Sequence, residues 1–357
     1  MSQRRDAALF LRCFSIAITL LFNTFYNSNS RVLNDMTILL RQSSLCLASA
    51  TFSLFLSSSL PQLSSGFLAA PSFKNTSIFT ANLTTSSHLK MGIFDMLRGG
   101  EPTLIDPSKA LPGRSTKMPN IDGYKHYITG NPLTEVPPGH KVAVFANGCF
   151  WGSEKGIWRL PEGIYSTAVG YCAGFTPNPT YEEACSGLTG HTEGVRVVYD
   201  PSKISFVDIL RWFWEAHDPT SGMGQGNDRG TQYRSGFYYF DEEQKALIEA
   251  SKEAYEKQLG RPITTEIAAA SDYDKYGGLW YFAETYHQQY LAKPGSRPYC
   301  SAQPQGVSLA PFETWCPKEL QEKHKPTLPE AFWKKHGSVR GCSVVQAPNE
   351  PIAVGDW

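Results

Sequence analysis

The sequence has no C-x-x-C pair and no excess of charge of either sign. Its eight cysteines are spread over 357 residues, which is too sparse for a disulfide scaffold and excludes a zinc ribbon or a thioredoxin-type motif. The 33 Lys and Arg balance the 33 Asp and Glu, so no basic field is available to hold nucleic acid. Any cysteine chemistry must therefore use single residues that folding brings together.

Patterns for binding phosphates and metals are also missing. The glycines of residues 222–230 do not follow a strand and open a helix, as those of a dinucleotide loop would. No cluster of His, Cys and carboxylates has the spacing of metal ligands, so we expect no bound cofactor and no metal. The composition is 41% hydrophobic, 13% aromatic and only 18% charged, which favours a compact domain with an aromatic-lined site.

The first 90 residues differ in composition from the rest of the chain. They carry seven Lys and Arg but only two acids, and they are rich in Ser, Thr, Leu and Phe, which is typical of a targeting segment. The apolar runs 13–22 and 45–56 are too short for a stable membrane span. A signal-like run followed by Phe67 and acid-free sequence resembles the bipartite presequences of complex plastids. We therefore expect residues 1–90 to be a removed presequence for a plastid, with the mitochondrion or the secretory pathway as the alternative.

The remainder divides into three parts by pattern. Residues 91–140 are rich in proline and glycine and predict an extended lead-in on the surface. Residues 141–300 carry helical and strand periodicity, and they form the predicted catalytic domain. Residues 301–357 are again rich in proline, and we expect a tail that lies over the domain.

Strands and helices alternate irregularly within the predicted domain. The periodicity predicts strands at 141–146, 164–171, 195–199 and 263–270, and helices at 150–159, after Ser205, at 242–259, at 283–291 and at 330–335. This mixture predicts an α+β fold, a two-layer mixed-sheet sandwich with an extended C-terminal tail. The polar connection 218–235, with four glycines and no periodicity, is typical of a functional loop.

Cys149 lies where a strand is expected to turn into a helix. Unpaired N–H groups and the dipole at a helix N-terminus favour a thiolate, so we expect the pKa of Cys149 to be low. Phe150 and Trp151 follow directly and offer an apolar pocket beside the sulfur. On these grounds alone a buried, inert cysteine fits equally well.

A series of motifs in register decides between these alternatives. They are GCFWG (148–152), STAVG (166–170), PNPTY (177–181), SGLTGHTE (186–193), NDRGTQYRS (227–235) and HQQYL (287–291), with ALPGR (110–114) upstream. Over residues 141–300 this series resembles peptide-methionine sulfoxide reductase A. The resemblance implies a ferredoxin-like α+β fold and an enzyme that reduces the S epimer of methionine sulfoxide, free or in oxidised proteins, to methionine.

The resemblance also implies the roles of the central residues. Cys149 is the nucleophile that attacks the sulfoxide sulfur, and Phe150 and Trp151 receive the methyl group of the substrate. Glu193 is the acid that protonates the departing oxygen. A sulfoxide oxygen leaves poorly unless it is protonated, and a carboxyl group in an aromatic cavity has the raised pKa that a general acid needs.

Further polar residues are assigned by the same motifs. By resemblance the hydroxyl groups of Tyr181 and Tyr233 hold the sulfoxide oxygen. Asp228 matches the polar residue of the substrate site that the glycine-containing loop supplies, which gives this loop its function. We expect two histidines of these motifs to be structural, His191 and His287, because no carboxylate partner is evident by spacing. We also expect Cys172 and Cys185, which lie between the motifs, to be buried, inert thiols.

Resolution of the sulfenic acid requires a second thiol. The resemblance makes Cys300 the candidate, but residues 301–304 and Ser308 replace the glycines and the further cysteine found in some relatives. Cys316 or Cys342 could pass the disulfide on to thioredoxin, or Cys300 could do so directly. We expect thioredoxin or another dithiol as the reductant and a chain that acts as a monomer.

Two other functions compete with the reductase. A cysteine hydrolase would need an adjacent histidine base and an oxyanion hole, and would work without a reductant. A non-catalytic protein that binds oxidised methionine would keep the aromatic residues but lack the nucleophile or the acid. Since Cys149 and Glu193 are both present, the reductase is the favoured function.

Overall fold

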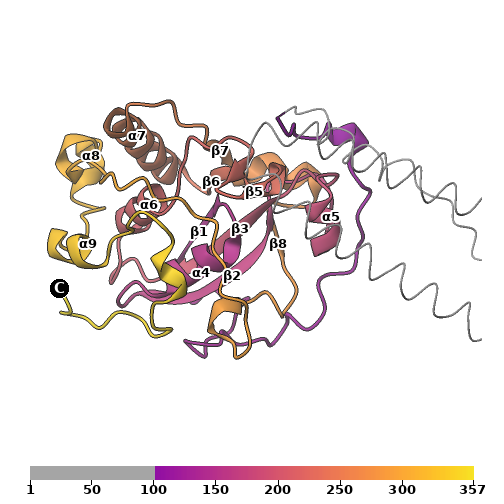
Figure 1. Ribbon diagram of the computed structural model, residues 1–357, viewed down its shortest axis with the longest axis horizontal. Helices are drawn as coiled ribbons and strands as arrows, with labels where there is room; N and C mark the ends of the chain where they lie inside the picture. The colour runs from indigo at the N-terminus through magenta and orange to yellow at the C-terminus, as the bar shows by residue number, and fades with distance from the viewer. Residues whose placement is uncertain (1–100) are drawn as a thin grey trace, which may run out of the picture. The chain divides into compact units, whose positions relative to one another are not determined.

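The structure is a computed structural model that describes residues 101–357 (Figure 1). The expected presequence, residues 1–90, and the first part of the expected lead-in lie outside the described residues. From residue 101 to β1 the chain has one short 3-10 helix, η1 (Pro107–Lys109), and is otherwise irregular.

The described residues form strands of two to nine residues and helices of four to eighteen. The strands are β1 (Lys141–Asn147), β2 (Ile164–Cys172), β3 (Thr192–Tyr199), β4 (Gly224–Gln225), β5 (Asp228–Arg229), β6 (Ser235–Tyr239), β7 (Glu266–Ala269) and β8 (Trp280–Phe282). The α-helices are α4 (Phe150–Trp158), α5 (Tyr181–Cys185), α6 (Phe206–Glu215), α7 (Glu242–Leu259), α8 (Lys318–Gln321) and α9 (Glu330–His336). Further 3-10 helices are η2 (Thr231–Tyr233), η3 (Ala270–Tyr276), η4 (Tyr290–Ala292), η5 (Phe312–Thr314) and η6 (Ser343–Val345).

A six-stranded mixed sheet in the order β7-β6-β1-β3-β2-β8 is the centre of the fold. Only β6 and β7 run parallel among its neighbouring strands. Helices α4, α6 and α7 pack on one face in the main hydrophobic core, and residues of η3 and the segment after it cover part of the other face. The α+β fold class expected from the sequence is confirmed.

The turn from β1 into α4 depends on one glycine. Gly148 has φ +95°, and a Cβ there would lie 2.7 Å from the side chain of Gln225. A side chain is therefore excluded both by the left-handed backbone and by the close approach. The turn ends β1 and makes Cys149 the N-cap residue of α4.

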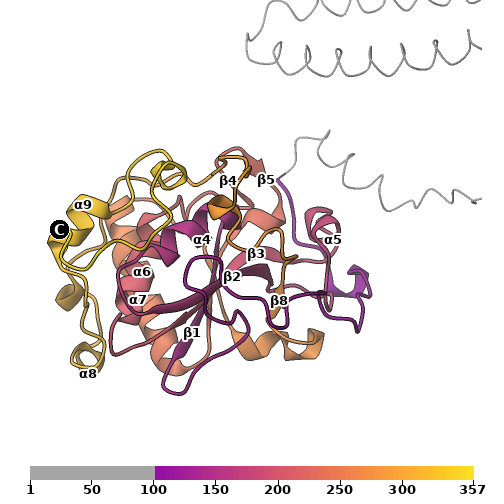
Figure 2. The same ribbon diagram turned by 90° about the horizontal axis from the view of Figure 1, so that it is seen from below.

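The C-terminal residues are integrated into the core. Phe332 of α9 is 1% exposed, and it packs with Leu309, Phe312 and Leu328 in the cluster that also contains α6 and α7. Figures 1 and 2 show this segment, in yellow, along the side of α6 and α4. At the end of the chain, Lys155 of α4 donates to Asn349 at 2.9 Å, which fixes the tail to the helix that begins after Cys149.

Two differences from the expected elements bear on the site. Residues 283–291 were expected to form a helix, but the chain makes turns there and only η4 is helical. Gln289 adopts the left-handed conformation, with φ 46°, and this ends any α-helical path. Strands β6 and β8 were not anticipated, because each is short and β8 has only three residues.

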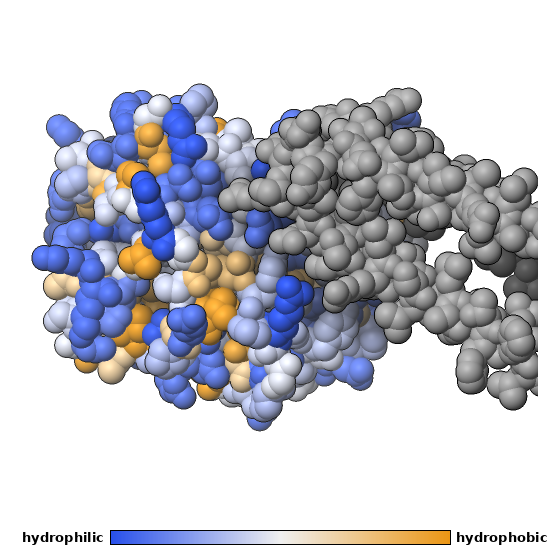
Figure 3. Space-filling view, in the orientation of Figure 1, coloured by the Kyte–Doolittle hydropathy of each residue, from blue (hydrophilic) through white to orange (hydrophobic). Residues whose placement is uncertain are grey.

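In residues 101–357 no helix is both long and apolar enough to cross a membrane. On the face shown in Figure 3, hydrophobic residues form separate small patches among hydrophilic ones. Large apolar side chains that are exposed, such as Phe240 at 49% and Val339 at 57%, belong to different segments of the fold.

Candidate active site

Glu193 is a buried acid that faces the first turn of α4. It lies on β3 opposite Tyr171 of β2, is 3% exposed, and its Oε2 accepts a hydrogen bond from the backbone N–H of Phe150 at 3.1 Å. Burial raises the pKa of Glu193 to about 8, although the Phe150 N–H opposes this rise. This raised pKa favours the protonated carboxyl group at neutral pH, with Oε1 free of the Phe150 N–H.

Cys149 is partly exposed at the N-cap position of α4. Burial raises the pKa of its thiol, the charge of Glu193 raises it further, and a hydrogen bond from the backbone of Trp151 opposes both effects. The expected low pKa is therefore wrong for this state, because desolvation and a facing carboxylate outweigh the helix N-terminus. Once Glu193 is protonated, it no longer repels a thiolate on Cys149. The protonated acid therefore favours the thiolate, and the thiolate favours the protonated acid.

Aromatic rings surround the apolar side of this pair. Phe150 is 1% exposed, and the indole of Trp151 stacks on the ring of Tyr290 with centroids 3.9 Å apart. Trp151 Nε1 donates to His287 Nδ1 at 3.1 Å, and the His287 ring lies 4.7 Å from that of Tyr181. These rings form an aromatic wall next to Cys149.

The two motif histidines are neutral and buried. Burial lowers the pKa of His287 to about 4 and that of His191 to about 3. Because His287 Nδ1 accepts from Trp151, its hydrogen lies on Nε2, which faces Glu284 Oε2 at 4.0 Å. His287 thus orients the indole and is not placed as a base for Cys149, which disfavours a cysteine hydrolase.

Three further residues of the predicted substrate site lie near Glu193. Tyr181 begins α5 and Tyr233 ends η2; burial raises the pKa of both phenols, and the charge of Glu193 raises both further. Asp228, on β5, also acts on Glu193 and on Tyr233. The three residues therefore come from three elements to the surroundings of one carboxyl group, and their roles toward substrate stay predictions.

Cys185 differs from expectation. It is partly exposed at the end of α5, its thiol is hydrogen-bonded to Tyr181, and burial raises its pKa to about 11. The charge of Cys185 also acts on Cys149, so Cys185 belongs to the wall of the site. Cys172, in contrast, is 0% exposed in the sheet.

Cys300 is bonded to Cys342, while Cys149 is free. A Cβ added to Gly152 of α4 would lie 2.7 Å from Cys300 Sγ, so the second glycine of GCFWG lets this sulfur rest against the first turn of the helix. Cys316 is buried in the main core and pairs with no cysteine in the described part of the chain. Of the two candidates for a third thiol, Cys342 is the one that the structure joins to Cys300.

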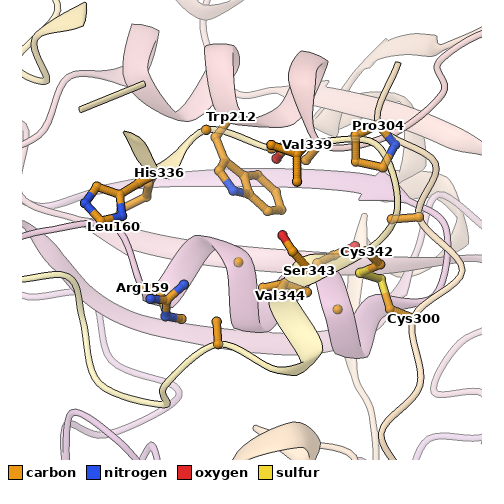
Figure 4. A pocket seen from close by; sticks show the side chains of 18 of the residues that line it. Arg159, Leu160, Trp212, Cys300, Pro304, His336, Val339, Cys342, Ser343 and Val344 are labelled. Carbon is orange, nitrogen blue, oxygen red and sulfur yellow. A yellow bond between two sulfur atoms is a disulfide. The ribbon is translucent and has the colours of Figure 1, made fainter. Parts of the chain in front are cut away.

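A cavity of about 80 Å³ adjoins this disulfide. It lies between α4 and the C-terminal segment, with Trp212 and Val344 on opposite sides and the Cys300–Cys342 bond at one end (Figure 4). Its lining includes neither Cys149 nor Glu193. The cavity is therefore separate from the aromatic wall described above. Within residues 101–357 no group of three or more His, Cys, Asp or Glu is placed to hold a metal ion.

Some residues of the site were given no part by the sequence analysis. Tyr299 donates its hydroxyl hydrogen to Asp228 Oδ1 at 2.5 Å and meets Trp151 edge to face at 6.4 Å. Tyr290 and His287 support Trp151 from the HQQYL motif. The HQQYL motif was the sequence feature that could have indicated these residues. Because a helix was expected over 283–291, the turn that directs these side chains toward Trp151 was not predicted.

Comparisons with known proteins agree with this geometry. The family model described as peptide methionine sulfoxide reductase matches residues 141–315. The chain is 52% identical to "Peptide methionine sulfoxide reductase MsrA 1" of Synechocystis over 57% of this chain and 89% of the relative. It is also 52% identical to an MsrA of Vibrio cholerae over 59% of this chain and 97% of the relative. The structure of methionine sulfoxide reductase A of Corynebacterium diphtheriae superimposes with a TM-score of 0.50 at 36% identity, covering 61% of this chain and all of the other.

Proposed function

Since this chain belongs to the methionine sulfoxide reductase A family and reduces methionine sulfoxide with thiols, we propose that Cys149 and Glu193 carry out the reduction. Cys149 attacks the sulfoxide sulfur, and the proton on Glu193 is transferred to the oxygen. The S–O bond of the sulfoxide breaks as the protonated oxygen is transferred to the Cys149 sulfur, so methionine leaves reduced and Cys149 is oxidised to a sulfenic acid. The substrate is the S epimer, free or in oxidised proteins.

The observation that carries this proposal is the placement of Glu193. Its carboxyl group is buried, held by the N–H of the residue that follows Cys149, and protonated at neutral pH. A general acid must have its proton at the working pH and stand within reach of the reacting atoms. The hydroxyl groups of Tyr181 and Tyr233 donate to the same oxygen, Asp228 completes the polar side of the site, and Phe150 and Trp151 enclose the methyl group.

The Cys300–Cys342 bond supports a two-step relay. The Cys300 thiol attacks the sulfenic sulfur of Cys149, which forms a Cys149–Cys300 disulfide and releases water. The Cys342 thiol then attacks the Cys300 sulfur, which returns Cys149 to its reduced state. The second product is the disulfide seen in the structure, with Cys149 free.

A thioredoxin-type dithiol completes the cycle by reducing Cys300–Cys342. Cys342 lies between the exposed residues Gly341 and Ser343, close in sequence to Val339, which is 57% exposed. This loop gives a reductant access to the sulfur without opening the aromatic pocket. The enzyme acts as a monomer, which is supported by the dispersed hydrophobic patches of the face in Figure 3.

Residues 1–90 deliver the protein to a plastid. Support comes from their composition alone: seven basic residues, two acids and a signal-like run followed by Phe67. Expression of residues 1–90 fused to a fluorescent protein, in cells with complex plastids, tests this assignment. Fluorescence in the mitochondrion or the secretory pathway would contradict it.

The relay is tested by mapping disulfides after one exposure to substrate. The full-length protein is prereduced, treated with an S-sulfoxide peptide without reductant, and digested for mass spectrometry. We expect methionine together with a Cys300–Cys342 link, and a trapped Cys149–Cys300 link in Cys342→Ser. Cys316→Ser is the matched control and should behave as the unaltered chain. A Cys149–Cys316 link would overturn the order of thiols, and absence of methionine would overturn the assignment of Cys149.

A further inference from the structure

Glu154 is a second buried acid, one turn along α4 from Phe150 and Trp151, and no step of the reaction above uses it. It is 0% exposed, and its carboxylate accepts three hydrogen bonds from uncharged donors. Oε2 accepts from the backbone N–H of Gln289 at 2.8 Å. Oε1 accepts from Gln289 Nε2 at 2.6 Å and from Thr167 Oγ1 at 3.0 Å. Two of the three donors therefore belong to Gln289.

Gln289 has a backbone conformation that its residue type rarely adopts. Its φ of 46° lies in the left-handed region, which residues other than glycine and asparagine rarely adopt. Such a conformation persists where the surroundings fix it from several sides. Here the Glu154 carboxylate binds both the main chain and the side chain of Gln289, and Gln289 Oε1 accepts from the N–H of Tyr127 at 3.1 Å.

The two residues that hold Trp151 lie close to Gln289 in the chain, His287 two positions before it and Tyr290 directly after it. His287 Nδ1 accepts from the indole N–H at 3.1 Å, and Tyr290 stacks on the indole at 3.9 Å with an angle of 17° between the rings. A single left-handed residue in this position turns the chain so that both side chains face α4. Glu154 and Trp151 are themselves on that helix, three residues apart.

We propose that Glu154 is a positioning residue, which fixes the orientation of the Trp151 indole by holding Gln289 in its left-handed turn. The carboxylate does not touch the substrate. Glu154 of α4 binds Gln289. The turn at Gln289 directs His287 and Tyr290 to Trp151, which lies on the same helix as Glu154. The inference rests on the proposed function of Trp151 in the substrate pocket, and it assigns specificity for the methyl group to a residue outside that pocket.

The test substitutes Glu154→Gln in the full-length protein. Whichever way the amide is oriented, its NH₂ group faces a donor of Gln289, so at least one of the two bonds is lost. We expect the indole N–H resonance of Trp151, assigned by its absence in Trp151→Phe, to shift and to exchange faster with solvent. We expect KM for an S-sulfoxide peptide to rise about tenfold, the cost of one buried hydrogen bond, with kcat within about threefold.

Thr167→Val is the matched control, because it removes a donor from Glu154 and leaves both bonds to Gln289. It should lower the melting temperature as a core substitution does, without moving the Trp151 resonance or KM. Gln289→Asn provides a milder variant: asparagine tolerates the left-handed turn and keeps the backbone N–H, but its shorter amide does not reach Oε1. It should raise KM in the same direction by a smaller factor.

The outcomes separate the proposal from the function on which it rests. If neither the resonance nor KM changes in Glu154→Gln and Gln289→Asn, Glu154 only fills the core and the proposal is overturned. If Thr167→Val raises KM as much as Glu154→Gln does, the effect is general destabilisation and the proposal is equally overturned. If the resonance shifts and KM does not, the indole is positioned as we propose but Trp151 has no part in binding, and the proposed function of Trp151 fails.

Discussion

The hydroxyl group of Tyr299 and the carboxylate of Asp228 are joined by a hydrogen bond of 2.5 Å, next to the cysteine that is bonded to Cys342. Asp228 Oδ1 is thereby occupied by a side chain of the protein itself. Its other oxygen, Oδ2, is buried and has no partner in the described part of the chain. In the Cys300–Cys342 state Tyr299 therefore joins the segment that carries Cys300 to the loop that carries Asp228.

We expect Tyr299→Phe to destabilise the protein in its Cys300–Cys342 state. The substitution keeps the ring against Trp151 but removes the hydrogen bond to Asp228, and a buried acceptor left without its partner costs about 1 to 3 kcal/mol. Urea denaturation of the oxidised variant and of the oxidised unaltered protein measures the difference in the free energy of unfolding. Equal free energies would show that the bond between Tyr299 and Asp228 does not stabilise this state.

Glu193→Gln should lower kcat about 100- to 10,000-fold, the usual range for loss of a general acid. Glutamine can still accept the Phe150 N–H, so the local structure is preserved while the transferable proton is lost. Steady-state kinetics with an S-sulfoxide peptide measures the effect, and an unchanged far-ultraviolet circular dichroism spectrum serves as the control for folding. A decrease of less than tenfold would assign the proton to another group.

The reaction should slow as the pH rises above 8. Burial raises the pKa of Glu193 to about 8, and only the protonated carboxyl group can donate to the oxygen, so the acid form is progressively lost through that value. Single-turnover rates between pH 6 and 10 would show this decline. In Glu193→Gln the alkaline decline assigned to Glu193 should be absent, and its persistence would attribute it to another residue.

The same carboxyl group should make the folded state less stable at high pH. Its pKa is raised in the folded state from an ordinary value of 4.5 to about 8, so the folded state binds more protons between those values and stability falls as the pH rises through them. Each unit of difference between the pKa in the folded and unfolded states changes the free energy of unfolding by ~1.4 kcal/mol. We therefore expect Glu193→Gln to be more stable than the unaltered protein by a few kcal/mol at pH 9 and equally stable near pH 4, measured by urea denaturation.

Gly152→Ala should impair resolution and leave the first chemical step intact. The added Cβ would lie 2.7 Å from Cys300 Sγ, so Cys300 could not rest against α4. A prereduced sample should still release one equivalent of methionine, while the Cys149–Cys300 link forms more slowly than in the unaltered protein. Quenched-flow mapping of the disulfides measures both, and Cys300→Ser gives the reference for complete loss of resolution.

Local signals in the sequence predicted much of the fold. The helix expected at 242–259 is α7, with Asp241 as the N-cap and the left-handed Gly260 as the C-cap. The strand expected at 141–146 and its turn into α4 are also present, because Asn147-Gly148 marks the turn. These elements are recognisable because their boundaries are set by residues within a few positions of one another.

What the sequence could not predict depends on distant contacts. The turn at Gln289 is fixed by Glu154, which lies 135 positions earlier, so the apolar spacing of residues 283–291 suggested a helix that does not form. The raised pKa of Cys149 depends on burial and on Glu193 from another strand. The bond from Cys300 to Cys342 was one of several open pairings, because spacing along the chain does not define disulfide partners.

The Cys300–Cys342 bond spans 42 positions, and the covalent loop that it closes contains α8 and α9. A ring of this size removes about 4 kcal/mol of chain entropy from the unfolded state. In the relay proposed above, each turnover closes this loop and each reduction by the dithiol opens it. The free energy of unfolding therefore rises and falls with the catalytic cycle, and a shortage of reductant would leave the enzyme in its more stable, disulfide-bonded form.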